Sequence, residues 1–190
     1  LNKAPPGPAI LSLHAFGSDP LWNLRVTGLV KEGDGDHALA EEYGWVVAAP
    51  YGSSKGPPSG CTDASRPCAW NAGGWSTAAA ANRSDVEFLS RVAAWLVAHA
   101  CVEETQVFAT GFSAGAMMAN RLACEASRVF RGVAPMAGSI VLGGDLLLCK
   151  PRQILSWVSF CGTEDGVCTK AEYGSLGQAA SFATFAAKCS

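Results

Sequence analysis

The stretch VFATGFSAGAMMANRL, residues 107–122, decides the fold of this chain. Residues 106–110 have the β-branched and aromatic content of a strand, and residues 114–124 are mostly strong helix formers. Between them, Gly111 to Gly115 match the pattern G-x-S-x-G, which places a serine on a sharp turn from strand to helix. Glycines flank the serine because such a turn leaves no room for side chains. The pattern predicts that the Ser113 hydroxyl projects from the turn and faces the N-terminus of the helix. A glycine-rich turn between two buried elements is the alternative interpretation.

Length and composition limit the classes of protein to consider. At 190 residues the chain can bury the core of one domain, so we expect residues 1–190 to form a single domain. The net charge is −2 with no basic block, which argues against a nucleic-acid partner. No apolar run approaches the length needed to cross a membrane. Because the chain begins at Leu1, we expect a processed form or a fragment.

The cysteines favour an oxidising, secreted setting over a set of small buried thiols. They are even in number and scattered, and no C-x-x-C pair suggests a metal site. Two close pairs could each close a short loop, although connectivity does not follow from sequence. A glycosylation sequon begins at Asn82 and also favours a secreted setting. The close pairs are Cys61 with Cys68 and Cys161 with Cys168. The other four cysteines are Cys101, Cys124, Cys149 and Cys189.

Strand and helix patterns alternate along the chain. A capping-box signature at residues 84–87 precedes apolar residues at helical spacing, which predicts an amphipathic helix packed on a sheet. A last helix is expected over residues 178–188. The alternation is typical of a mostly parallel sheet with helices on both faces. The other expected strands cover residues 9–13, 45–49, 132–136 and 154–160.

An acyl-transfer serine needs a base, an acid that orients the base, and donors for the oxyanion. In the α/β-hydrolase layout the chain order is serine, aspartate, histidine, and one oxyanion donor directly follows the serine. Ser113 and the N–H of Ala114 fit the first positions, and Asp165 follows an apolar strand, where the layout places its acid. A loop after the first strand would supply the second donor, the N–H of Ala15 or of Phe16.

Several stretches in order along the chain resemble one family, the extracellular polyhydroxybutyrate depolymerases and feruloyl or acetylxylan esterases of carbohydrate esterase family 1. The most specific is GFSAGAMMANRLACE, residues 111–125. The resemblance implies a secreted serine hydrolase that cleaves carboxylic esters without a metal or an organic cofactor, with Ser113 as nucleophile and Asp165 as triad acid. The other stretches are LHAFG (13–17), WNAG (70–73), DVEFL (85–89), APMAG (134–138) and CGTED (161–165).

The chain departs from this family in two places. Ala15 stands where the family usually has glycine, and its Cβ restricts the loop that carries the oxyanion donors. The family's base is a histidine in a Gly-His-x-Trp-type motif well after the acid, yet no histidine follows His99. We therefore expect the last strand and its histidine loop to be missing from this sequence, and the chain alone to be catalytically impaired. A catalytically dead module that binds glycan or ester, and an acyltransferase, are the alternatives.

None of the three histidines is a convincing substitute for that base. His14 lies on the oxyanion loop, where a structural role is expected. His37 belongs to an acidic, glycine-rich turn that does not meet the EF-hand pattern for calcium. His99 falls near the C-terminus of a predicted helix, where a cation favours the helix dipole.

The substrate is expected to be an ester-bearing polysaccharide, with polyester second. Phe16, Trp22, Trp70 and Trp75 could line an aromatic or sugar-facing cleft. Feruloyl or acetyl esters on polysaccharide rank slightly ahead of polyhydroxyalkanoate. No nucleic-acid or membrane partner is expected, and the oligomeric state stays open.

Overall fold

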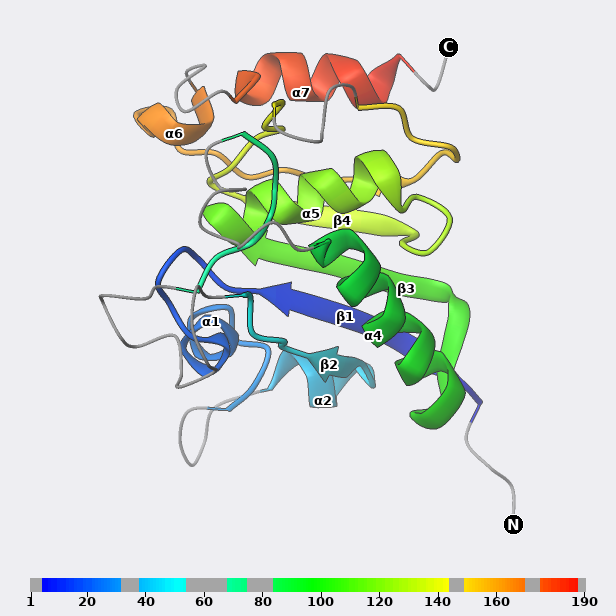
Figure 1. The fold of residues 1–190 in the computed structure, drawn as a ribbon. Helices are drawn as coiled ribbons and strands as arrows, with labels where there is room; N and C mark the ends of the chain where they lie inside the picture. The colour runs from blue at the N-terminus through cyan, green and yellow to red at the C-terminus, as the bar shows by residue number, and fades with distance from the viewer. Residues whose placement is uncertain are drawn as a thin grey trace.

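The computed structural model describes residues 5–31, 38–53, 68–74, 84–143, 149–169 and 175–187. Its centre is a five-stranded sheet in the order β2-β1-β3-β4-β5 (Figure 1). The strands are β1 (Gly7–Leu13), β2 (Val46–Ala48), β3 (Val102–Phe112), β4 (Gly132–Met136) and β5 (Ser156–Trp157). The helices are α1 (Pro20–Val26), α2 (Leu39–Tyr43), α4 (Asp85–His99), α5 (Ala114–Glu125), α6 (Gly166–Thr169) and α7 (Gly177–Ala186).

Every neighbouring pair in this sheet is parallel. All five strands therefore end at the same edge, and the loops that follow them gather there. The arrowheads of β1 and β3 in Figure 1 point to the side on which α1 and α6 lie. This arrangement confirms the predicted mostly parallel sheet with packed helices.

The core lies where α4 and α5 pack against the central strand. Almost every residue of α5 is buried, since the helix lies between the sheet and the surrounding loops. On α4, Leu89, Ala93 and Leu96 point inward at helical spacing, as the sequence predicts. The hydroxyl of Ser84 caps α4 by accepting the backbone N–H of Glu87 over 3.3 Å.

Of the five strands, β4 has its expected bounds, and β1 and β2 differ from theirs by one or two residues at an end. The differences at β3 and β5 are larger. β3 begins at Val102, four residues before the expected start, because its polar first half still pairs with β1 at Gly7. The strand expected over residues 154–160 is reduced to Ser156–Trp157, followed by an isolated bridge between Met136 and Phe160. An apolar run does not by itself fix strand length, because pairing with a neighbour decides where the ladder ends.

The structure contains disulfides between Cys124 and Cys149 and between Cys161 and Cys168. The second closes one of the two short loops suggested by the sequence. Cys68 is also disulfide-bonded, and its suggested partner Cys61 lies outside the described residues. Cys101 is an exposed free thiol.

A few sequence predictions fall outside the described residues, namely those on His37, Trp75, Asn82 and Cys189. Within the described ranges, no helix is long and apolar enough to cross a membrane. The same part of the chain contains no cluster of three or more side chains suited to hold a metal ion.

Candidate active site

Ser113 occupies the turn between β3 and α5 with φ 53° and ψ −115°. Side chains rarely adopt this backbone conformation, and holding it costs on the order of 1–3 kcal/mol. The turn is held on both sides, since the N–H of Ser113 donates to the Met136 carbonyl and its own carbonyl accepts the N–H of Met117, each over 3.0 Å. The residue is half-buried, and its hydroxyl makes no hydrogen bond to another described residue. Strain at an accessible hydroxyl is the arrangement expected of a nucleophile.

Backbone packs directly on backbone around this turn. A Cβ on Gly111 would overlap the backbone of Gly115, and a Cβ on Gly115 would overlap the carbonyl oxygen of Leu13. A Cβ on Gly138 would lie 2.7 Å from the carbonyl oxygen of Ser113. Both motif glycines are therefore required by contact, as the sequence pattern predicts.

The N-terminus of α5 supplies the first candidate oxyanion donor. Ala114 is its first residue, and its N–H makes no hydrogen bond within the described part of the chain. The first N–H groups of a helix lack partners in the helix and carry the positive end of its dipole. This N–H is therefore available to the oxyanion that would form when the Ser113 oxygen attacks a carbonyl carbon.

The loop with the second candidate donors lies beside the serine turn. β1 pairs with β3, with Leu13 opposite Gly111, so the loop after β1 leaves the sheet next to the turn after β3. A Cβ on Gly115 would also lie 2.7 Å from the carbonyl oxygen of His14, which places the start of this loop against α5. Ala15 is half-buried and Phe16 is exposed.

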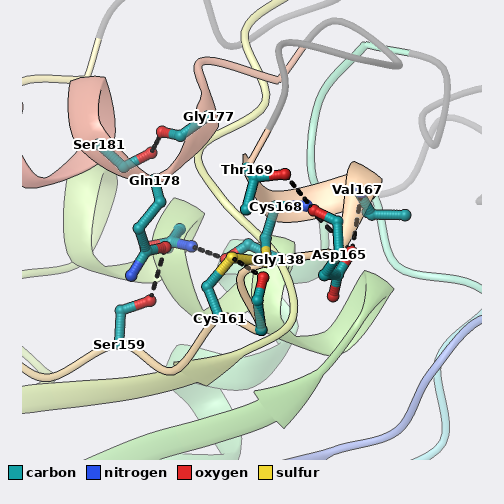
Figure 2. The surroundings of a disulfide bond; sticks show 12 residues. Gly138, Ser159, Cys161, Asp165, Val167, Cys168, Thr169, Gly177, Gln178 and Ser181 are labelled. Atoms are coloured by element: carbon teal, nitrogen blue, oxygen red, sulfur yellow. Dashed lines mark hydrogen bonds between the residues drawn. A yellow bond between two sulfur atoms is a disulfide. The ribbon is translucent and has the colours of Figure 1, made fainter.

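Asp165 follows β5 at the same edge of the sheet. One carboxylate oxygen, Oδ1, accepts the N–H groups of Val167 at 2.8 Å and Cys168 at 3.4 Å, so the side chain caps the short helix α6. Its backbone carbonyl accepts the hydroxyl and the N–H of Thr169. The disulfide between Cys161 and Cys168 encloses this turn (Figure 2). The other oxygen, Oδ2, has no hydrogen bond to a described residue and can accept one from an imidazole.

His14 is fully buried, and both of its ring nitrogens are engaged. Nδ1 donates to the carbonyl of Ala15 over 2.7 Å, and Nε2 accepts the N–H of Gly52 over 2.9 Å. Burial lowers the pKa of this imidazole below its ordinary value of 6.5. A neutral ring with no unoccupied nitrogen has a structural role, as expected for this loop.

His99 lies far from the serine. It ends α4 just before β3 begins, whereas Ser113 follows the end of β3. The strand separates them by roughly 20 Å, since its residues Val102 to Gly111 pair with Gly7 to Leu13 of β1, six steps of about 3.3 Å each. Its Nδ1 contacts the Trp95 carbonyl over 2.9 Å, and its ring stacks on the indole of Trp95.

The aromatic residues proposed for a cleft divide into two groups. Trp22 on α1 and Phe16 are exposed, at 45% and 44% of their surface. Trp70 is 0% exposed, so its ring packs in the core and the expectation that it lines a cleft is wrong. The surrounding loop of small and polar residues resembled a surface segment, but Asn71 and Ala72 are buried with it.

A buried polar network that the sequence analysis missed holds this loop. The Nη1 of Arg121 donates to both the backbone and the side-chain oxygen of Asn71 over 2.9 Å. The N–H of Asn71 donates to the carboxylate of Asp85 over 2.6 Å. The signal was an arginine inside a mostly apolar helix, since a buried charge requires polar partners.

Comparison with known proteins gives relatives that are esterases. No protein-family profile matches the chain. Feruloyl esterase B of Piromyces equi is 35% identical over 103 residues, covering 52% of this chain and 18% of the relative. Acetylxylan esterase A of Talaromyces purpureogenus is 29% identical, and the match covers 73% of this chain and 32% of the relative. Acetylxylan esterase A of Aspergillus awamori is 27% identical, and the match covers 80% of this chain and 46% of the relative. The chain thus spans less than half the length of each of these relatives. They fit the family that the sequence resembles.

Solved structures support the fold. A carboxylesterase of Bacillus cereus matches with a TM-score of 0.59 at 16% identity, covering 98% of this chain and 74% of the other. An S-formylglutathione hydrolase from Agrobacterium tumefaciens matches with a TM-score of 0.50 at 16% identity, covering 74% and 55%. At such identities the likeness concerns the fold alone, which is that of the α/β-hydrolases.

Proposed function

We propose that this chain hydrolyses carboxylic esters through an acyl-enzyme formed on Ser113. The observation that carries the proposal is the strained turn of Ser113 at the carboxyl edge of a parallel sheet, next to the N–H of Ala114, which makes no hydrogen bond to a described residue. The relatives described above are feruloyl and acetylxylan esterases, which supports the same reaction here.

In this mechanism the Ser113 oxygen attacks the ester carbonyl as its proton passes to a base. The carbonyl oxygen becomes an oxyanion, which accepts hydrogen bonds from the N–H of Ala114 and from an N–H of the loop at Ala15 and Phe16. One such donor contributes about 3 kcal/mol to the transition state. Collapse of the intermediate expels the alcohol, which takes the proton from the base. Water then attacks the acyl-enzyme by the same steps in reverse and releases the acid.

The triad acid in this proposal is Asp165, whose Oδ2 would orient the imidazole of the base. His14 cannot be that base because both of its nitrogens are engaged, and His99 lies at the opposite edge of the sheet. We therefore assign the base to a histidine outside the described residues. Without it, turnover falls by up to about a millionfold, as in other serine hydrolases that lose this residue.

The substrate class follows from the names of the relatives and belongs to the proposal. Feruloyl and acetyl esters carried by polysaccharide rank first, and polyhydroxyalkanoate second. Phe16 and Trp22 offer exposed aromatic surface near the carboxyl edge of β1. An extracellular location fits the disulfides, which persist in oxidising compartments.

The decisive experiment uses protein expressed from its complete coding sequence. The wild type should turn over p-nitrophenyl acetate and methyl ferulate and should be labelled by a fluorophosphonate. Ser113→Ala should lose turnover and labelling while remaining folded. Ser159→Ala, a matched loss of a hydroxyl whose one hydrogen bond to the described residues goes to the Gln178 amide oxygen, should keep both turnover and labelling.

Two other outcomes separate the alternatives. A folded wild type that binds xylan fragments yet shows neither turnover nor labelling is a binding module, an outcome favoured by the engaged nitrogens of His14. Release of the acyl group to an added alcohol in preference to water identifies an acyltransferase, since both acceptors use the same acyl-enzyme. Turnover that survives in Ser113→Ala contradicts the assignment of the nucleophile.

A further inference from the structure

The loop that carries the second oxyanion donors rests on one buried indole. The Nε1–H of Trp70 donates to the carbonyl oxygen of His14 over 2.9 Å. Its ring also packs against the His14 imidazole, with centroids 5.0 Å apart. The bonded carbonyl belongs to the peptide unit that joins His14 to Ala15.

That hydrogen bond fixes the direction of a candidate oxyanion donor. A peptide unit is planar, and in the trans form its C=O and N–H point in opposite directions. No cis peptide occurs among the described residues. When Trp70 holds the carbonyl of His14, the N–H of Ala15 must point to the other side of the same plane. That N–H makes no hydrogen bond to a described residue.

The next peptide unit is fixed by the same group of residues. The carbonyl of Ala15 accepts from Nδ1 of His14 over 2.7 Å and from the N–H of Ser18 over 3.1 Å. The imidazole is itself held by the N–H of Gly52 on Nε2. By the same planarity, the N–H of Phe16 points away from the His14 ring. Both candidate donors thus have directions set by contacts behind the loop.

Trp70 is itself held from several sides. Arg121 and Asp85 bind the backbone and side chain of Asn71, the next residue. The N–H of Ala69, the preceding residue, donates to Ser53 over 2.9 Å. One residue earlier, the carbonyl of Cys68 accepts the N–H of Gly17 from the far end of the donor loop. The indole is therefore a fixed support and not a mobile side chain.

We propose that Trp70 is a positioning residue of the ester hydrolysis, which acts through its Nε1–H by fixing the His14–Ala15 peptide so that the donors of this loop face the oxyanion. The inference rests on the function proposed for Ser113. It assigns to the residue a role that needs its N–H group, beyond the packing of its ring.

The test replaces the indole N–H while keeping an aromatic ring. Trp70→Phe, in protein from the complete coding sequence, should lower kcat on p-nitrophenyl acetate about tenfold or more with KM within about twofold, because a misdirected donor weakens transition-state binding. Trp157→Phe is the matched control, since its Nε1–H donates to Asn120 over 2.8 Å in a different part of the core. Trp157→Phe should lose about as much thermal stability as Trp70→Phe but keep the wild-type kcat.

A second variant guards against a general packing defect at this fully buried position. Replacing Trp70 by β-(3-benzothienyl)alanine keeps the shape and removes only the N–H, so it should show the same loss of kcat as Trp70→Phe. Backbone ¹⁵N order parameters of Ala15 and Phe16 should fall in both position-70 variants and stay at wild-type values in Trp157→Phe.

Three outcomes overturn the inference. A folded benzothienyl variant with wild-type kcat removes the role of the N–H and leaves the Ser113 mechanism intact. An equal loss of kcat in Trp157→Phe shows that any lost indole hydrogen bond has this effect. A wild type without turnover or labelling refutes the proposed function, and the positioning role with it, before any position-70 variant is compared.

Discussion

Gly115 and Leu13 are in such close contact that the first turn of α5 rests on the carbonyl oxygen that ends β1, with no space for a side chain between them. The contact joins the element that follows Ser113 to the strand that precedes the loop of Ala15 and Phe16. It therefore sets the separation between the proposed nucleophile, Ser113, and the proposed second group of oxyanion donors.

Gly115→Ala should consequently reduce stability and activity together. The added Cβ overlaps the carbonyl of Leu13, and overpacking against backbone costs about 3 kcal/mol of unfolding free energy. Urea unfolding monitored by circular dichroism measures the loss, and p-nitrophenyl acetate turnover measures the effect on the site. Gly162→Ala is the control, because the nearest atom to its added Cβ is 3.7 Å away, and it should unfold like the wild type.

Ser113→Gly should be inactive, and it should be more stable than the equally inactive Ser113→Ala. Glycine adopts φ 53° without the steric cost that a side chain incurs, so the unfolding free energy should rise by about 1 kcal/mol relative to Ser113→Ala. Both variants lack the Ser113 hydroxyl, so the comparison isolates backbone strain. Equal stability of the two variants would show that the turn stores no strain.

Arg121→Met should cost about 3 kcal/mol of stability, since it leaves the oxygens of Asn71 buried without their donor. Arg121→Lys should not restore the loss, because one ammonium cannot reproduce the planar contacts that the guanidinium makes to Asn71 and Glu125. Lys31→Met removes an exposed ion pair with Glu41 and should leave urea unfolding unchanged.

His14 should make the protein less stable in mild acid. Its pKa is lowered in the folded state by burial, so below about pH 6.5 the unfolded chain binds a proton that the folded chain does not. The contribution is fully present above the unfolded pKa and is lost as the pH falls toward the folded value. The free energy of unfolding of His14→Gln should fall less between pH 7 and about pH 5. The ¹⁵N shifts of the wild-type ring should show a neutral imidazole protonated on Nδ1.

The disulfides Cys124–Cys149 and Cys161–Cys168 should contribute differently to stability and to activity. Bonds across 25 and 7 residues constrain the unfolded chain to different extents, so replacing Cys124 and Cys149 by serine should cost about 1 kcal/mol more than replacing Cys161 and Cys168. Only the second pair encloses Asp165, so its loss should lower kcat. Urea unfolding and turnover of the two double variants measure both effects. A larger loss of kcat in the variant without the 124–149 bond would contradict this assignment.

The sequence was sufficient for the parallel sheet and the serine turn because both rest on local patterns. The glycines on either side of Ser113 are required by close backbone contacts at the turn, so their spacing predicts the turn. The alternating apolar segments predict the strands and helices because these segments are the ones buried in the core. Trp70 was misplaced because its neighbours are small and polar, and their burial depends on Arg121 and Asp85, which are distant in sequence. The structural role of His14 was predicted, but its partner was not, because Gly52, whose N–H binds Nε2 of His14, is distant in sequence.

The exposed thiol of Cys101 lies between α4 and β3, at the opposite end of the central strand from the serine. A maleimide-linked dye or a solid support attached there would hold the molecule with the Ser113 turn facing away from the support. Single-molecule observation and immobilised use of the protein therefore require no engineered cysteine, provided that the bonded cysteines stay oxidised.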